Sequence, residues 1–277
     1  MEKVIQPRIK FSFGISELWA HRELLYFFTW RDIKIRYKQA VLGIVWTILQ
    51  PLMLMIIFTL FLSGSFRLDT GHVPVPVYYL CGIIWWNFFY QAVNNASQSM
   101  VGNANLIKKI YFPRLIIPIS AVLTAAFDFL IQLLLLFGLI IYYSLFQGFN
   151  PHYPALITSI IAGFILCTLF AFGTGTLLSA INVKYRDVRY ALPFFLQGLF
   201  FLTPVIYTSS DIPSAWVKNM VAANPLDLII DLTRNSLIYE VHNVFIINII
   251  PFIFLFILLL TAIYIFRNTE AYFADII

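Results

Sequence analysis

The stretch that decides the fold is residues 115–143, LIIPISAVLTAAFDFLIQLLLLFGLIIYY. Its only charged side chain is Asp128. As a helix it would be about 43 Å long at 1.5 Å per residue, whereas crossing the ~30 Å hydrocarbon core of a bilayer takes about 20 apolar residues. A barrel strand would instead alternate in polarity over ~10 residues. The stretch therefore predicts a membrane-spanning helix.

The composition of the whole chain agrees with a membrane protein. Of its 277 residues, 61% are hydrophobic and 11% charged, against roughly 45–50% and 25% in soluble domains. These figures exclude an ordinary soluble enzyme, a disordered chain and a disulfide-stapled secreted domain. Six apolar runs predict an all-α membrane protein with six transmembrane helices, at about 41–63, 78–98, 115–143, 155–182, 191–207 and 244–266.

The distribution of positive charge predicts the orientation. With these spans, 15 of the 18 lysines and arginines fall in residues 1–40, in the connections after the second and fourth spans, and in residues 267–277. Loops that stay in the cytoplasm carry such an excess. We therefore predict a multi-pass protein whose two terminal tails, 1–40 and 267–277, are cytoplasmic. The N-terminal residues lack the features of a cleavable signal peptide, so the first span would serve as the insertion signal.

Two segments outside the spans also predict helices. Residues 16–38 mix aromatic and basic side chains, which is typical of an amphipathic helix lying in the membrane interface, although a solvated basic tail is the alternative. The outer connection, 208–243, predicts a two-helix hairpin. Asn224 is a helix-capping residue type, and Pro225 and Asp227 suit the first turn that follows. Pro213 and Trp216 open the shorter helix of this hairpin.

The sequence has few residues that could carry out chemistry. It has no phosphate-binding Gly-x-x-x-x-Gly-Lys-Ser/Thr loop, His-Glu-x-x-His motif or paired carboxylates, so we expect no catalytic residue, metal or cofactor in this chain. Ala171, Gly175 and Ser179, four residues apart, predict close helix packing. Asp128 must find a partner in the membrane. Gln132 lies one turn away, and an interhelical hydrogen bond is favoured over a proton or cation relay.

Aromatic residues, 18% of the chain, suggest a surface for sugars. A ring face can meet the C–H face of a pyranose, while amides meet its hydroxyls. The same rings could instead only fill helix interfaces. As the wall of a substrate conduit we predict Trp46 in the first span, Trp85, Asn87, Phe88, Phe89 and Gln91 in the second, and Phe200, Phe201 and Tyr207 in the fifth.

Several short motifs, in order along the chain, carry a family resemblance. They are Trp30 to Lys38, Leu42 to Trp46 with Gln50-Pro51, Leu106 to Arg114, Lys184 to Val188, Pro193 to Tyr207, and Asn224-Pro225. Together they resemble the permease subunit of type 2 ABC exporters, in the branch that exports O-antigen, capsule or teichoic-acid polysaccharides. The resemblance covers about residues 16–267.

The resemblance implies partners and roles. It implies a homodimer around a central conduit in the bacterial cytoplasmic (inner) membrane, with two separate ATP-binding subunits that hold ATP and Mg on the cytoplasmic face. It places contacts with those subunits in residues 16–38 and 101–114, where the basic candidates are Arg31, Lys34, Lys108, Lys109 and Arg114. It places an outer gate in residues 212–240, with Pro213, Trp216, Asn224, Pro225 and Asp227.

The leading hypothesis is thus the transmembrane subunit of an ATP-driven exporter of a lipid-linked polysaccharide. The same architecture exporting a drug or a lipid is the nearest alternative. A membrane-embedded transferase would need clustered acids or histidines, and an ion-coupled carrier would need several buried charges. Nothing in the sequence indicates a nucleic-acid partner or tells which glycan is moved.

Overall fold

The computed structural model describes residues 15–38, 43–62, 72–185, 187–209, 212–237, 248–270 and 273. Parts of several predicted segments lie outside these ranges. They are residues 1–14 and 39–40 of the N-terminal tail, most of the C-terminal tail, the ends of the first span, the start of the sixth span, and residues 210–211 and 238–243 of the predicted outer connection.

Every regular element in the described ranges is a helix. The helices are α1 (Ile15–Ala20), α2 (Arg22–Lys38), α3 (Val45–Leu62), α4 (Val75–Gly102), α5 (Ala104–Lys109), α6 (Ile116–Gln147), α7 (Tyr153–Lys184), α8 (Val188–Phe201), α9 (Ala215–Ala222), α10 (Pro225–Leu237) and α12 (Ile250–Glu270). The all-α prediction is therefore confirmed for the part of the chain described. Among the described residues, four helices, α3, α6, α7 and α12, are long and apolar enough to cross a membrane.

The second and fifth predicted spans differ from these four. α4 has 28 residues and is long enough, but its amide side chains lower its hydropathy. α8 has 14 residues and ends at Phe201, six residues before the predicted end of the fifth span. The chain turns over Leu202–Ile206, because Pro204 has no N–H with which to continue a helix.

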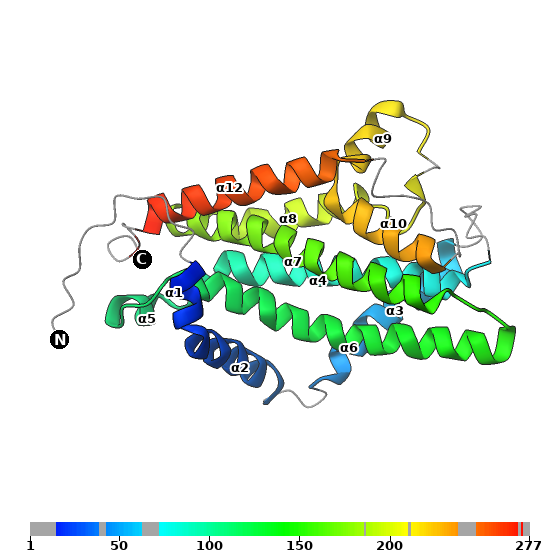
Figure 1. The fold of residues 1–277 in the computed structure, drawn as a ribbon, viewed down its shortest axis with the longest axis horizontal. Coiled ribbons are helices and arrows are strands. Elements are labelled where there is room, and N and C mark those ends of the chain that lie inside the picture. Colours follow the sequence, from blue (N-terminus) through cyan, green and yellow to red (C-terminus); the bar gives the residue numbers. More distant parts are fainter. Residues whose placement is uncertain are drawn as a thin grey trace.

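α4 is the central helix of the bundle. Its most extensive contacts are with α6 and α7, and it also packs against α3, α8 and α10. Figure 1 shows these helices running side by side along the long axis of the molecule. The small residues predicted to mediate packing do so. A Cβ atom added to Gly175 of α7 would lie 2.6 Å from Cβ of Ala96 in α4, so only glycine permits this approach.

The N-terminal segment forms two helices rather than one. The chain turns at His21, whose N–H is bonded to the carbonyls of Glu17 and Leu18, and α1 already begins at Ile15. α2 then lies against α6. Phe28 anchors α2 by packing on Phe112 at a centroid distance of 5.7 Å, in a small cluster that joins α2 to the α5–α6 connection. The helical prediction holds, with a break that the sequence pattern did not show.

The connection predicted to be an outer hairpin contains α9 and α10, at the end of the bundle opposite α2 and α5 (Figure 1). Asn224 caps α10 as predicted, because its Oδ1 accepts a hydrogen bond from the backbone N–H of Leu226 at 3.0 Å. Asn224 Nδ2 also donates to Thr203 Oγ1 at 3.0 Å, which ties the start of α10 to the turn after α8.

Candidate functional site

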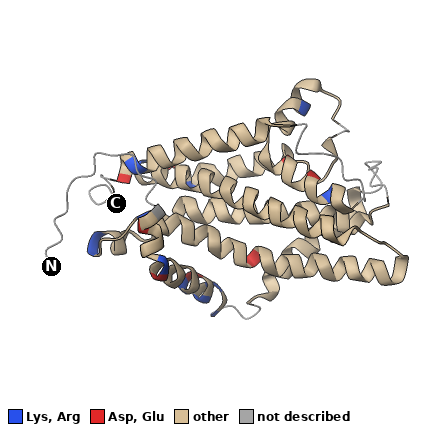
Figure 2. Ribbon diagram, viewed as in Figure 1, with Lys and Arg blue, Asp and Glu red and all other residues tan. Residues whose placement is uncertain are grey.

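Positive charge gathers at one end of the molecule, on α2, on α5 and near the end of α12 (Figure 2). Lys34, Lys108 and Lys109 are exposed there. The two arginines that were also predicted to contact the ATP-binding subunits, Arg31 and Arg114, form hydrogen bonds within the chain instead. Arg31 donates to Asp32 Oδ1 at 2.7 Å and to Asn103 Oδ1 at 3.0 Å. Arg114 donates to the backbone carbonyl of Glu270, which links the start of α6 to the end of α12.

The acidic residue inside a span has two partners on α2. Arg36 forms a salt bridge with Asp128, and the Tyr37 hydroxyl donates to the other carboxylate oxygen. Tyr37 also lies 3.1 Å from Thr47 Oγ1 of α3. Burial, together with the neighbouring Asp128 carboxylate, raises the pKa of Tyr37 to about 12, so this hydroxyl remains a donor at neutral pH.

These contacts supply hydrogen-bond donors to both carboxylate oxygens of Asp128. The prediction of an interhelical hydrogen bond is confirmed, but its partners come from α2 and not from Gln132, whose Oε1 makes no hydrogen bond within the described residues. Arg36 Nη1 also donates to Gln91 Oε1 of α4 at 3.3 Å. The network therefore joins α2, α4 and α6 at one point.

Amide and hydroxyl side chains form a polar stripe on α4, which we define as Asn87, Gln91, Asn94, Asn95, Gln98, Ser99 and, just past the helix end, Asn103. The spacing of three or four residues keeps them on one helical face. The half of the stripe from Asn94 onward lines a polar pocket of about 510 Å³ between α2, α4 and α6. Arg31, Arg36 and Thr124 complete its wall.

The aromatic residues predicted for the conduit divide into two groups. Trp85, Phe88 and Phe89 of α4 are at most 1% exposed and belong to the core. Trp85 packs on Phe129 at 4.6 Å and donates its indole N–H to Thr233 Oγ1 at 3.0 Å. Asn87 is also buried, and Gln91 accepts the bond from Arg36. Within one chain these residues pack neighbouring helices together, and Phe89 also lines the apolar pocket described below.

The second group lies at the surface. Trp46, in the first turn of α3, is 55% exposed, and Phe201, at the end of α8, is 62% exposed. Phe200 is partly buried against Trp86 of α4, at a centroid distance of 5.3 Å. Tyr207 donates its hydroxyl to the carbonyl of Phe201 at 2.9 Å, which holds the turn after α8 in shape.

A buried arginine fixes the outer hairpin to the bundle. Arg234 of α10 is 2% exposed, and its guanidinium lies 3.7 Å from the ring centroid of Tyr78 in α4. It donates to four backbone carbonyls, those of Tyr78 (3.3 Å), Pro204 (2.6 Å), Val205 (2.7 Å) and Tyr207 (3.4 Å). We call this arrangement the Arg234 cage. A Cβ atom at Gly82 would lie 2.8 Å from Arg234 Nη2, so glycine leaves room for it.

The predicted gate residues divide between α9 and α10. Pro213 and Trp216 are exposed on the α9 side, whereas Pro225 and Asp227 are buried in α10. Asp227 accepts a hydrogen bond from Ser209 at 2.6 Å. Burial, and then the nearby Asp231 carboxylate, raises the pKa of Asp227 to about 7.

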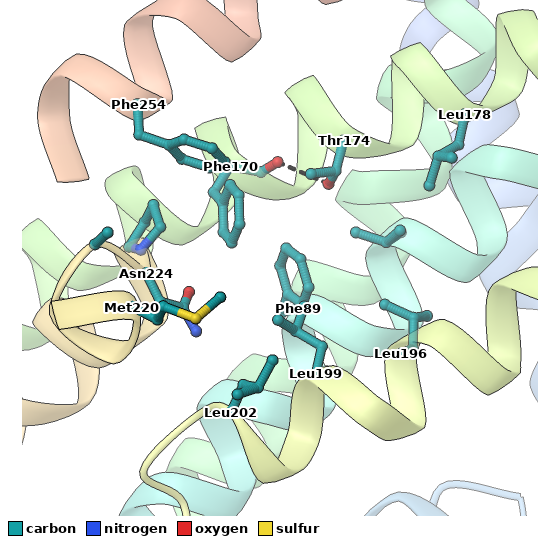
Figure 3. Close-up of a pocket in the computed structure, with 13 residues that line it drawn as sticks. Phe89, Phe170, Thr174, Leu178, Leu196, Leu199, Leu202, Met220, Asn224 and Phe254 are labelled. Carbon is teal, nitrogen blue, oxygen red and sulfur yellow. Dashed lines mark hydrogen bonds between the residues drawn. The ribbon is translucent and has the colours of Figure 1, made fainter. Parts of the chain in front are cut away.

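An apolar pocket of about 390 Å³ opens between α4, α7, α8, α9, α12 and the start of α10 (Figure 3). Phe89, Phe170, Leu196, Met220 and Phe254 point into it. Its two polar residues are engaged elsewhere. The Thr174 hydroxyl donates to the Phe170 carbonyl, and the Asn224 amide is held by Thr203 and Leu226. The pocket therefore offers an apolar surface among helices that can span a membrane.

Sequence reasoning missed Arg36 and Tyr37 as the partners of Asp128, and it missed the Arg234 cage. Arg36 was read only as part of a basic segment, yet a charge inside a span calls for an opposite charge. Arg234 falls within the predicted outer connection, 208–243, where a charged residue is expected to be solvated. Its place on the face of α10 that also carries Ile230 and Leu237 was the available signal of burial.

Comparison with known proteins identifies the family. Residues 23–238 match the family model described as "ABC-2 type transporter". The chain is 29% identical over 276 residues to the O-antigen export system permease protein RfbA of Klebsiella pneumoniae, covering 97% of this chain and 99% of the relative. It is 27% identical over 213 residues to the protein of the same name from Myxococcus xanthus, covering 76% and 79%. It is 21% identical over 208 residues to the polysialic acid transport protein KpsM of Escherichia coli, covering 74% and 78%. The chain therefore belongs to the ABC-2 type transporter family of membrane permeases.

Proposed function

We propose that this chain is the transmembrane subunit of an ATP-driven exporter that moves a lipid-linked polysaccharide across the bacterial cytoplasmic membrane. The observation that carries the proposal is the similarity, over 97% of the chain, to a permease of an O-antigen export system. The polysialic acid transporter relative also handles a glycan, by its name. The relatives named above export or transport a glycan, by their names, which favours the glycan over the drug or lipid alternative.

In the proposed topology, six helices cross the membrane: α3, α4, α6, α7, α8 with the turn after it, and α12. α4 can cross despite its amides because protein surrounds most of it, and it needs little lipid-facing apolar surface. Both termini are cytoplasmic in this topology, because the basic helices α2 and α5 lie together at one end (Figure 2). α2 then lies at the cytoplasmic face and α9 and α10 at the outer face.

Coupling to two ATP-binding subunits, which hold ATP and Mg, is proposed at the cytoplasmic end. Lys34, Lys108 and Lys109 are exposed there and free to meet a partner, whereas Arg31 and Arg114 hold α2 and the α5–α6 connection in place. Reversing both α5 lysines, Lys108→Glu with Lys109→Glu, should reduce the amount of ATP-binding subunit that co-purifies. Lys218→Glu, an exposed lysine on α9, is the matched control. Normal co-purification and normal export by the double variant would contradict this docking site.

The conduit is proposed to form between two copies of the chain, along surfaces that carry Trp46 and Phe201, with Phe200 and Tyr207 beside them. Exposed rings can give a sliding glycan many weak contacts of similar strength. Trp85, Phe88 and Phe89 support the fold of each subunit instead. Trp46→Ala with Phe201→Ala should therefore lower export while leaving the melting temperature unchanged.

The outer gate is proposed to be the α9–α10 hairpin. α9 has little contact with the bundle and carries the exposed Trp216, whereas α10 is fixed by the Arg234 cage. The moving part would then be α9 and not the whole hairpin. A disulfide that joins the two copies of α9 should stop export, and its reduction should restore export. Unaltered export through a verified cross-link would exclude α9 as a gate.

The test of the function as a whole is export in cells. Deleting this chain from its host should remove the polysaccharide from the cell surface and leave the lipid-linked glycan inside. The wild-type chain should restore the surface glycan only with an active ATP-binding subunit, and a subunit unable to hydrolyse ATP is the control. A normal surface glycan in the deletion strain would refute the proposal.

A further inference from the structure

The chain that follows α8 takes its hydrogen-bond donors from another helix. α8 ends at Phe201, and residues 202–208, which we call the turn segment, form no helix. A backbone carbonyl without a donor is costly among helices that pack in a membrane. Three carbonyls of the turn segment, those of Pro204, Val205 and Tyr207, accept hydrogen bonds from Arg234. The shape of the turn segment therefore depends on one side chain of α10.

Rings proposed for the conduit lie at the two ends of the turn segment. Phe201, directly before it, is 62% exposed, and Tyr207 lies near its end. The Tyr207 hydroxyl donates to the Phe201 carbonyl at 2.9 Å, so the two residues stay close together. Thr203 and Val205, in the middle of the segment, are buried. The shape of this buried middle therefore determines where the two rings lie.

The guanidinium group of Arg234 supplies a pattern of donors that lysine lacks. Nη1 donates to the carbonyls of Pro204 and Tyr207. Nη2 donates to the carbonyl of Val205 and, in α4, to that of Tyr78. A lysine ammonium group carries three donors at one point, whereas the planar guanidinium group carries five in a fixed fork. Four carbonyls around two nitrogen atoms therefore require arginine, and a positive charge alone does not replace it.

Other bonds attach α10 to the bundle without the turn segment. The Trp85 indole N–H donates to Thr233 Oγ1 at 3.0 Å, and Ser236 Oγ lies 3.0 Å from Ser159 Oγ of α7. These bonds hold α10 against α4 and α7. The distinct contribution of Arg234 is its three bonds to the turn segment.

Gly82 of α4 lies directly beside one of these three bonds. A Cβ atom at Gly82 would lie 2.8 Å from Arg234 Nη2 and 3.0 Å from the carbonyl oxygen of Val205. These are the two atoms that share a hydrogen bond of 2.7 Å. A single methyl group at Gly82 therefore disturbs this bond while every side chain of the cage stays in place.

We propose that Arg234 is a positioning residue of the conduit, which holds the turn segment in the shape that places Phe201 and Tyr207 against the moving glycan. This assignment rests on the proposed function. Arg234 is buried and does not touch the glycan itself. It acts through the carbonyls of the turn segment, so the arrangement of its donors, and not only its charge, determines export.

The experiment uses the full chain with its ATP-binding subunits and compares two variants with two controls. Arg234→Lys keeps the charge and loses the fork of donors. Gly82→Ala keeps the arginine and adds one methyl group. Gly138→Ala, in α6, is the matched control, because a Cβ atom there meets nothing within 4 Å. Thr233→Val removes a bond of α10 to α4 and leaves the cage intact.

Hydrogen–deuterium exchange, followed by mass spectrometry, measures opening of the turn segment and of α10 separately. Arg234→Lys and Gly82→Ala should speed exchange in the turn segment about tenfold or more, because hydrogen bonds from a charged donor are lost or weakened. α10 should change less, and the ATP-binding subunit should co-purify as with the wild type. Surface glycan in the complemented deletion strain should fall for both variants. Both controls should keep wild-type exchange in the turn segment and wild-type surface glycan.

Two results would overturn the assignment. Exchange that stays at the wild-type rate in the turn segment, or that rises equally there and in α10, would reduce Arg234 to an anchor of α10. Normal surface glycan despite faster exchange in the turn segment would show that its shape does not matter for export. If Arg234→Lys does not fold, Gly82→Ala decides both points. Failure of the proposed function is distinguishable, because the deletion strain would then keep its surface glycan whichever variant is supplied.

Discussion

The Arg36–Asp128 pair allows a quantitative test of how α2 is held against the bundle. Asp128→Asn keeps the size of the side chain but removes the charge opposite Arg36. Breaking a fully buried ion pair by removing one partner costs roughly 3–5 kcal/mol. Here the Asp128 side chain is 4% exposed but that of Arg36 is 33% exposed, so water screens one member. We therefore expect a loss of roughly 2–3 kcal/mol in the free energy of unfolding.

A double-mutant cycle separates the pair from its surroundings. Arg36→Met should also destabilise, because it leaves the Asp128 carboxylate with Tyr37 as its remaining partner. The double variant should be less destabilised than the sum of the two, with a coupling energy of roughly 1–3 kcal/mol. Asp32→Asn is the matched control. Its partner is Arg31 on the same helix, the two side chains are 27% and 29% exposed, and the cost should be at most about 1 kcal/mol.

Unfolding of the purified chain in mild detergent by a titration with dodecyl sulfate gives the free energies. Additive effects of Arg36→Met and Asp128→Asn, or losses no larger than that of Asp32→Asn, would show that the pair does not hold α2. Export by the folded Asp128→Asn variant would in addition argue against a proton or cation relay through this carboxylate.

Three further predictions follow from buried residues. Trp85→Ala should destabilise the chain by roughly 3–5 kcal/mol, because the Trp85 ring is buried. Trp46→Ala should leave the unfolding midpoint unchanged, because the Trp46 ring is exposed. Equal midpoints for the two variants would contradict the division of the aromatic residues into a buried and an exposed group. Gly175→Leu should abolish folded protein in size-exclusion profiles, because even a Cβ atom there lies 2.6 Å from Ala96; a wild-type elution peak would show that α4 and α7 can separate. Burial raises the pKa of Asp227 from 3.8 to about 7, so its contribution to stability is fully present below pH 3.8 and lost as the pH rises to about 7. Asp227→Asn should flatten the pH dependence of the melting temperature over that interval, and an unchanged slope would assign the dependence to another group.

Sequence patterns within one or two helical turns predicted most of the helices. They did not predict contacts between residues that are distant in sequence. The Asn224 cap and the proline after it lie within one turn of α10, so their role could be predicted. The end of α8 at Phe201 could not be predicted in this way, because the apolar run continues to Tyr207 and a proline does not always end a helix: Pro193 lies inside α8. Burial of Trp85 depends on α6 and α10, which a count of aromatic residues does not include.

The candidate site shows the same limit. The sequence predicted that amides of α4 would bind the hydroxyls of a sugar. That these amides share one face follows from the period of the helix. The sequence could not show that the C-terminal half of this face lies against α2, because Arg36 and Asp128 are 92 residues apart. A charge inside a span predicts that a partner exists and does not tell which of the available cations it is.

The enclosure of α4 also bears on how the chain is made. A nascent helix is released from the translocon into lipid according to its own apolarity, and each centrally placed polar residue opposes that step. α4 carries the polar stripe and falls outside the helices that are apolar enough to partition alone. Its release then depends on neighbours that cover the stripe, and α6, which packs along it, is synthesised next. If α4 spans the membrane as proposed, we expect it to remain beside the translocon until α6 emerges, so that the two helices enter the bilayer as a pair.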